Sequence, residues 1–205
     1  MRTGPLWRVL RLLPGVLVGG AVGGALCDQI HVQAGVLSYP GDQGRLLPDQ
    51  SWWVGPQFGI AMAVVVLTAV PFARRTQRRA APEFVVAAVL FLLAYLASGV
   101  FDGHPAVLLG AYVGAWLVRV ALTRPAERAV VAVYSVALAL GGCLYEGALA
   151  GTGAFSYAHP DVFHVPMWLA GIYLHGAPLA LLVSRALDPF SSGTPSSATA
   201  RPTSP

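Results

Sequence analysis

The chain has 205 residues, of which 56% are apolar and only 11% are charged, and its mean hydropathy is +0.63. A soluble domain usually carries about 25% charged residues, so this composition excludes an ordinary soluble globular protein. The formal charge is +4, but the basic residues are all arginines near the ends of apolar segments, which argues against a nucleic-acid partner. The composition therefore predicts one all-α integral membrane domain, over residues 1–188.

Six apolar segments are each about long enough to cross a hydrocarbon core of roughly 30 Å as a helix. They cover residues 6–27, 53–73, 84–101, 106–122, 129–149 and 165–187. The first is interpreted as a span and not as a cleaved leader, because Leu26 before Cys27 does not suit a lipoprotein cleavage site. The third and fourth are short, so a buried hairpin that does not cross the membrane fully is the alternative. The sequence predicts six transmembrane helices in three hairpins.

The arginines predict the orientation of these spans. With both termini on the same side, twelve of the thirteen arginines fall on that side, and only Arg45 falls on the other. Positively charged residues accumulate on the cytoplasmic side of membrane proteins, so both termini are expected in the cytoplasm. The end of the chain, residues 189–205, is rich in Ser, Thr, Pro and Gly and is expected to be a disordered cytoplasmic tail.

Acidic residues and histidines gather on the opposite, outer side. Asp28 and His31 are three residues apart, and Asp161 and His164 repeat this spacing. The set also includes Asp42, Asp49, Asp102, His104, Glu146 and His159, with His175 inside the last span. Three histidines and a carboxylate can hold zinc and activate water. A metal-dependent membrane lipid hydrolase is therefore one hypothesis, and polar residues at helix ends without bound metal are the other.

A weak internal repeat joins the first and last predicted hairpins. Residues 35–39 read Gly-Val-Leu-Ser-Tyr, and residues 153–157 read Gly-Ala-Phe-Ser-Tyr. An acidic residue, Asp28 or Glu146, precedes each tyrosine by eleven positions, and a tryptophan, Trp52 or Trp168, opens each following span. The two hairpins are interpreted as related copies, against the alternative that their loops merely share a composition.

Glycines with small-xxx-small spacing occur in two of the predicted spans. They are Gly15, Gly19, Gly20, Gly23 and Gly24 in the first span, and Gly110 and Gly114 in the fourth. Such faces allow two helices to approach closely. They are explained by tight internal packing, and a homo-oligomeric contact (a dimer or a trimer) or a groove that admits lipid are the alternatives.

Three stretches of the sequence resemble the Insig (insulin-induced gene) family. Residues 51–56 read Ser-Trp-Trp-Val-Gly-Pro and are followed by Gly59 and Ala61, as at the opening of the second Insig span. Residues 97–102 end in an Ala-Ser-x-x-x-Asp turn that is similar to the end of the third Insig span. Residues 153–176 resemble the last Insig hairpin without a gap, and keep Tyr157, Pro160-Asp161 and Trp168-Leu169.

The resemblance implies six spans with both ends cytosolic, in agreement with the arginines. It also implies a non-enzymatic protein that binds an oxysterol-like lipid between its helices and, when loaded, holds other membrane proteins. The chain departs from the family at residues 118–124, where an acidic residue needed for partner control is missing, and at residues 103–105. The Arg-only, Ala- and Gly-rich composition points to a bacterial homologue in the cell membrane.

The leading hypothesis is therefore a non-enzymatic protein that holds a diacylglycerol- or sterol-like lipid in a cavity between helices, with no cofactor and no metal. Its net affinity must come from shape and a few polar groups, because the lipid tail is already solvated in the bilayer. The candidate lipid-binding residues are Gln57, Asp102, Tyr112 and Trp116.

Overall fold

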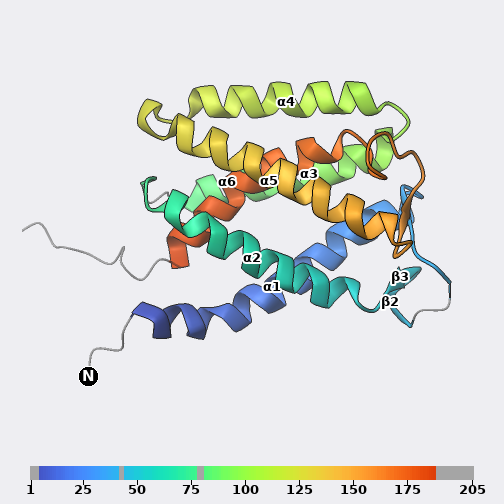
Figure 1. The fold of residues 1–205 in the computed structure, drawn as a ribbon. Coiled ribbons are helices and arrows are strands. Elements are labelled where there is room, and N and C mark those ends of the chain that lie inside the picture. Colours follow the sequence, from blue (N-terminus) through green and yellow to red (C-terminus); the bar gives the residue numbers. More distant parts are fainter. Residues whose placement is uncertain (1–4, 42–43, 78–80, 188–205) are drawn as a thin grey trace, which may run out of the picture.

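The computed structural model describes residues 5–41, 44–77 and 81–187. Within them are six long helices, and Figure 1 shows that they run roughly side by side. They are α1 (Pro5–Gln33), α2 (Val54–Ala73), α3 (Ala81–Phe101), α4 (Pro105–Leu122), α5 (Pro125–Gly151) and α6 (Leu169–Leu187). All six are long and apolar enough to cross a membrane, which confirms the predicted fold class. The predicted tail, residues 189–205, lies outside the described residues.

The third and fourth segments form two separate helices of 21 and 18 residues, each long and apolar enough to cross a membrane, which favours two spans over the alternative of a buried hairpin that does not cross fully. The first helix continues six residues past its predicted end at Cys27 and carries Asp28 and His31 in its last two turns. Both polar side chains are buried inside the bundle. Because these polar side chains are buried against other helices, α1 can continue past the end of its apolar segment.

Apart from Arg45, the arginines whose side chains the structure describes gather at one end of the bundle. The α2–α3 and α4–α5 connections and the end of α6 lie at the same end as the start of α1 (Figure 1). These segments carry Arg74, Arg75, Arg119, Arg124, Arg128 and Arg185. The opposite end carries the α1–α2, α3–α4 and α5–α6 connections and is called the outer end below.

Two short antiparallel strand pairs lie at the outer end. Strand β1 (Leu37–Ser38) pairs with β4 (Ser156–Tyr157), and β2 (Arg45–Leu47) pairs with β3 (Gln50–Ser51). The first pair joins the α1–α2 connection to the α5–α6 connection, which are more than a hundred residues apart in the chain. It therefore fixes the first hairpin against the last one.

Helix α6 is the centre of the bundle. It contacts α2, α3, α4 and α5, and 56% of its span is buried, a larger share than in any other helix. Its outer part joins a core cluster around Trp168, Leu169 and Ile172, and its inner part joins a second cluster around Ala177 and Leu181.

Glycines of α1 determine how closely it approaches α2. A Cβ atom on Gly24 would lie 2.3 Å from Cγ and 2.4 Å from Cβ of Phe58. The Cβ of Phe58 is fixed to the backbone, so a larger residue at this position would push the two helices apart. Gly23, one residue earlier, has no atom within 4 Å of such a Cβ.

Replacing Gly24 by alanine is expected to lower the free energy of unfolding by about 1–3 kcal/mol, the usual cost of overpacking a closely packed core. The measurement is unfolding in mixed detergent micelles, followed by tryptophan fluorescence. Gly23→Ala is the matched control and should leave stability unchanged or raise it slightly. Equal losses for the two variants would contradict close packing of Gly24 on Phe58.

Candidate functional site

The internal repeat seen in the sequence is a structural repeat. The Tyr39 hydroxyl donates to Asp28 Oδ1 at 2.9 Å, and the Tyr157 hydroxyl donates to Glu146 Oε2. In both hairpins the acid lies in the last turns of the first helix, eleven residues before the tyrosine. The same bond in the same place favours related copies over a chance similarity of the loops.

The two copies pair with each other through equivalent residues. Ser38 and Ser156 are equivalent residues of the repeat, pair with each other across β1 and β4, and place their Oγ atoms 2.9 Å apart. Gly35 and Gly153, also equivalent, both have a positive φ, at 72° and 79°. Only glycine adopts this conformation without strain, so both helices end in the same kind of turn.

The tryptophan of the first copy is Trp53 and not Trp52. The Trp53 ring packs edge-on against Tyr39 at 5.6 Å, as the Trp168 ring packs against Tyr157 at 6.1 Å. Trp52 is 58% exposed, whereas Trp168 is fully buried. Two adjacent tryptophans could not be distinguished by spacing alone.

The tyrosines of the repeat act as neutral donors. Burial raises the pKa of Tyr39, and the charge of Asp28 raises it further. Burial and then Glu146 likewise raise the pKa of Tyr157. The acids have further partners: Gln50 Nε2 donates to Asp28 Oδ2 at 2.7 Å, and the Tyr173 hydroxyl donates to Glu146. These networks join the helices at the outer end.

Asp102 is a buried acceptor at the end of α3. Its Oδ1 accepts from Trp168 Nε1 at 2.8 Å, and its Oδ2 lies 2.7 Å from His159 Nδ1. Nearby, His31 Nε2 lies 2.8 Å from the hydroxyl of Ser98, and the imidazole stacks on Tyr95 at 4.9 Å. The polar residues of the outer end therefore bind one another in pairs across helices.

No group of three or more His, Cys, Asp and Glu residues among the described residues could hold a metal ion. The acids and histidines that motivated the hydrolase hypothesis are distributed over separate contacts. Asp161, for example, accepts from the backbone N–H of Met167 at 2.9 Å, and Arg45 pairs with Asp49. Asp42 lies outside the described residues.

The four candidate lipid-binding residues come from separate parts of the bundle. Gln57 is half-buried in the first turn of α2, and Asp102 follows α3. Tyr112 of α4 is buried, and its hydroxyl donates to the Ala94 carbonyl at 2.6 Å. Trp116, one turn further along α4, has a buried Nε1 atom without a hydrogen-bond partner among the described residues. Their assignment to a lipid stays a prediction.

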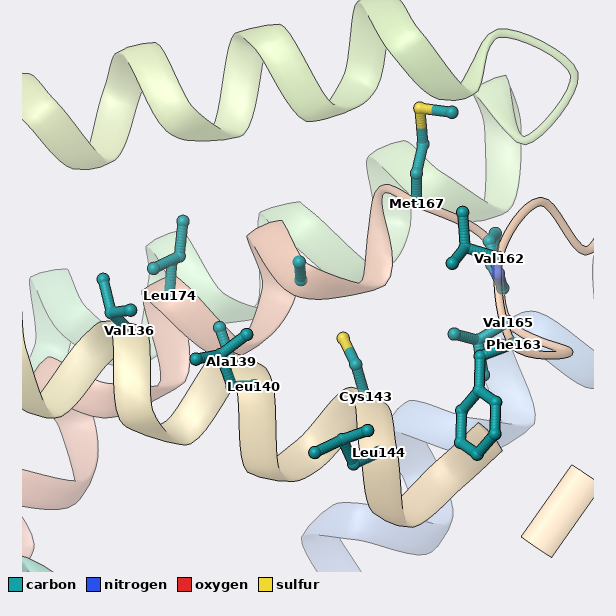
Figure 2. A pocket seen from close by; sticks show the side chains of 12 residues that line it. Val136, Ala139, Leu140, Cys143, Leu144, Val162, Phe163, Val165, Met167 and Leu174 are labelled. Atoms are coloured by element: carbon teal, nitrogen blue, oxygen red, sulfur yellow. The ribbon is translucent and has the colours of Figure 1, made fainter. Parts of the chain in front are cut away.

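An apolar groove lies between α5, α6 and the turn that precedes α6, and none of the four candidate residues lines it (Figure 2). Its volume is about 350 Å³, at the lower end of the roughly 300–1,000 Å³ typical of ligand pockets. The residues that line it are Val136, Ala139, Leu140, Cys143 and Leu144 of α5, Val162, Phe163, Val165, Pro166 and Met167 of the turn, and Ala170 and Leu174 of α6. We call it the α5–α6 groove.

The groove opens on the surface that faces lipid. Leu140 and Leu144 lie on its α5 side and are mostly exposed. The turn at its outer end is tight: Val162 and Val165 bridge to each other, and Phe163 and His164 both have a positive φ. This turn places the Phe163 ring against Gly147. Sequence reasoning missed the groove, because apolar residues that line a groove look like any others in a span.

Two comparisons found no match: neither a protein-family model nor a curated protein sequence matches the chain. Among solved structures, the mycobacterial Insig homolog MvINS from Mycobacterium vanbaalenii has a TM-score of 0.66 and 22% identity. The alignment covers 90% of this chain and 95% of that one. A cross-linked trimer of MvINS has the same TM-score, with 21% identity, over 91% of this chain and 96% of that one. The chain is thus an integral membrane protein with an Insig-like fold.

Proposed function

We propose that this protein is a non-enzymatic lipid-binding membrane protein and that the α5–α6 groove holds the apolar part of the lipid. The observation that carries the proposal is the groove itself. It is lined almost entirely by carbon and sulfur atoms, opens toward the bilayer and has no titratable group except the thiol of Cys143. Such a surface suits an acyl chain or a sterol-like ring system and offers no chemistry for hydrolysis.

The ligand class is a diacylglycerol- or sterol-like lipid. A groove of about 350 Å³ encloses only part of such a molecule. The polar head must therefore lie beyond the groove, where Gln57, Asp102, Tyr112 and Trp116 are the candidates named from the sequence. The Insig-like fold supports the proposal, because the chain also resembles the Insig family in its sequence motifs, and that family is expected to bind lipids of this kind.

The proposal includes an orientation and an assembly. The arginine-rich end faces the cytoplasm of a bacterial cell, and both termini are cytoplasmic. The cross-linked trimer of MvINS and the exposed glycines of α1 support a homo-oligomer, a trimer or a dimer. Thiol labelling from each side of the membrane measures the orientation, and cross-linking in intact membranes measures the oligomeric state.

Cys143 makes the proposal testable, because its thiol lines the groove and points away from the α5 backbone toward α6 (Figure 2). In a Cys27→Ser variant it is the single thiol of the chain. The rate at which N-ethylmaleimide labels Cys143 is measured in detergent at rising concentrations of 1,2-dioleoylglycerol or cholesterol. We expect at least one of the two lipids to slow the labelling in a saturable way.

Replacing Ala139 by phenylalanine should fill the groove and weaken lipid protection of Cys143 on the order of tenfold, equivalent to about 1.4 kcal/mol. Ala139 is buried and lines the groove. Ala137→Phe is the matched control, because Ala137 is exposed on α5 outside the groove. Thermal unfolding of both variants verifies that they are folded. Labelling that neither lipid slows would overturn the proposed function.

A further inference from the structure

The hairpin formed by β2 and β3 exposes two large apolar side chains. Leu46 of β2 is 50% exposed, and Trp52, which follows β3, is 58% exposed. Residues 44–52 contain only two charged residues, Arg45 and Asp49, and these pair with each other at the surface. We call residues 44–52 the outer hairpin. It presents an apolar surface and carries no net charge.

The length of α2 gives the depth of these two side chains in the membrane. The helix has 20 residues, and such a helix is about 30 Å long, the thickness of the hydrocarbon core. Its start therefore lies at the boundary between hydrocarbon and headgroups. Trp52 is two residues before that start. The Cδ2 atom of Leu46 lies 3.1 Å from the position that a Cβ of Gly55 would take, in the first turn of α2. Both side chains are thus at the membrane boundary.

The apolar surface of the outer hairpin continues along α2. Ile60, Val64 and Leu67 are each about half exposed, and their spacing of four and three residues places them on one face of the helix. Pro56, one turn before Ile60, is exposed as well, and Trp52 lies a further four residues back. This face of the span contacts lipid. Leu46 and Trp52 therefore extend the lipid-facing surface of α2 toward the headgroups.

The backbone of the outer hairpin sets the opposite limit on its depth. β2 and β3 form a sheet of two strands, so among the described residues each strand has one edge that pairs with no other strand. Unpaired backbone N–H and C=O groups cannot lie in the hydrocarbon core, because no water is present there to bond them. The headgroup layer supplies water for the backbone and apolar depth for the side chains, and tryptophan is enriched in this layer.

Hydrogen bonds to α1 hold the outer hairpin in place. Gln50 is fully buried, and its Nε2 donates to the Ala25 carbonyl at 2.9 Å and to Asp28 Oδ2 at 2.7 Å. Gln29 Nε2 donates to the Pro48 carbonyl at 2.9 Å. The two exposed side chains are therefore pre-organised, and contact with a surface requires little further ordering of the chain.

We propose that the outer hairpin is a membrane-surface anchor, in which Leu46 and Trp52 insert into the headgroup boundary of the leaflet at the outer end. The hairpin recognises the boundary between polar and apolar layers and not the charge of the headgroups, because Arg45 and Asp49 compensate each other. The anchor fixes the depth of α1 and α2 in the bilayer. It is separate from the α5–α6 groove, which is lined by other segments.

The test measures the depth of two adjacent positions, Leu46 and Arg45, with a spin label on a single cysteine. Leu46→Cys and Arg45→Cys are made in a Cys27→Ser, Cys143→Ser background and placed in phosphatidylcholine liposomes. Consecutive residues of a strand point to opposite sides, so the two labels probe opposite sides of the hairpin. Oxygen dissolves in lipid, whereas a polar nickel chelate stays in water. The ratio of oxygen to nickel collisions should be on the order of tenfold higher at position 46 than at position 45.

Ile60→Cys is the lipid-facing reference and should give the highest ratio, and thermal unfolding verifies that all three labelled variants are folded. Replacing part of the phosphatidylcholine by phosphatidylglycerol should leave the ratio at position 46 unchanged, and a rise would overturn recognition without charge. Low ratios at both hairpin positions would place the hairpin in water and overturn the anchor. A label at position 46 that is shielded from both reagents and coupled to the label of a second copy would assign this face to an oligomer and also overturn it.

Tryptophan fluorescence tests the anchor without a label. Phosphatidylcholine brominated near the carboxyl ends of its chains should quench Trp52, so Trp52→Phe should remove part of the quenched signal. Trp168→Phe is the matched control, because Trp168 is fully buried and its loss should leave the quenched signal unchanged. Equal quenching with and without Trp52 would overturn the anchor, whatever lipid the α5–α6 groove binds.

Discussion

Replacing Trp168 by alanine is expected to lower the free energy of unfolding by about 3–5 kcal/mol, the usual cost of removing a large buried ring. Trp168 is fully buried, packs edge-on against Tyr157 and His31, and donates its indole N–H to Asp102. The variant would leave a cavity and remove one partner of a buried carboxylate. The free energy is measured by unfolding in mixed detergent micelles.

Trp52→Ala is the control for this prediction, because Trp52 is 58% exposed at the same end of the bundle. Its loss should change the free energy of unfolding by less than about 1 kcal/mol, as is usual for surface substitutions. A similar loss in both variants would mean that the Trp168 ring is not part of the core. Trp168→Phe should fall between the two, since it keeps most of the packing and loses the hydrogen bond.

Replacing Asp28 by alanine has the second largest expected effect, a loss of roughly 2–6 kcal/mol. The reason is that the Tyr39 hydroxyl would lose its acceptor and the Gln50 amide would lose one of its two, since it also donates to the Ala25 carbonyl; each lost bond costs about 1–3 kcal/mol. Asp28 is 6% exposed, so water cannot easily replace it. Asp28→Asn should cost less, because its carbonyl oxygen still accepts from one donor.

The equivalent acid of the second hairpin provides the control. Glu146→Ala leaves the Tyr157 and Tyr173 hydroxyls without their acceptor, so it should show the same order of effects as Asp28→Ala. Because each acid bonds its own set of partners, the double variant should lose about the sum of the single losses. If Asp28→Ala left the free energy of unfolding unchanged, the structural role of this hydrogen-bond network would be contradicted.

The number of helices could be predicted from the sequence, because each apolar segment carries its own signal. Helix ends could not be predicted as well. The predicted first span ended at Cys27, whereas α1 continues to Gln33, since Asp28 and His31 have hydrogen-bond partners outside α1. The last span was predicted from residue 165, but α6 begins at Leu169 after the tight turn at Phe163 and His164.

The candidate site was likewise only partly predictable from the sequence. The repeated acid–tyrosine spacing was visible in the sequence, because both partners lie within eleven residues. The α5–α6 groove was not, because its lining comes from three segments and depends on a turn with two residues of positive φ. His175 appeared in the sequence only as a histidine within a span, and its contact with the Tyr112 carbonyl depends on how α4 packs against α6.

The repeat of the first hairpin in the last one has a consequence for how freely this sequence can vary. Helices α2 and α6 occupy equivalent places in the repeat, but 28% of the α2 span is buried, against 56% of the α6 span. The difference arises because α3 and α4 cover α6. The exposed positions of α2 need only stay soluble in lipid, whereas the buried positions of α6 must fit protein neighbours, so α6 should tolerate fewer substitutions than α2.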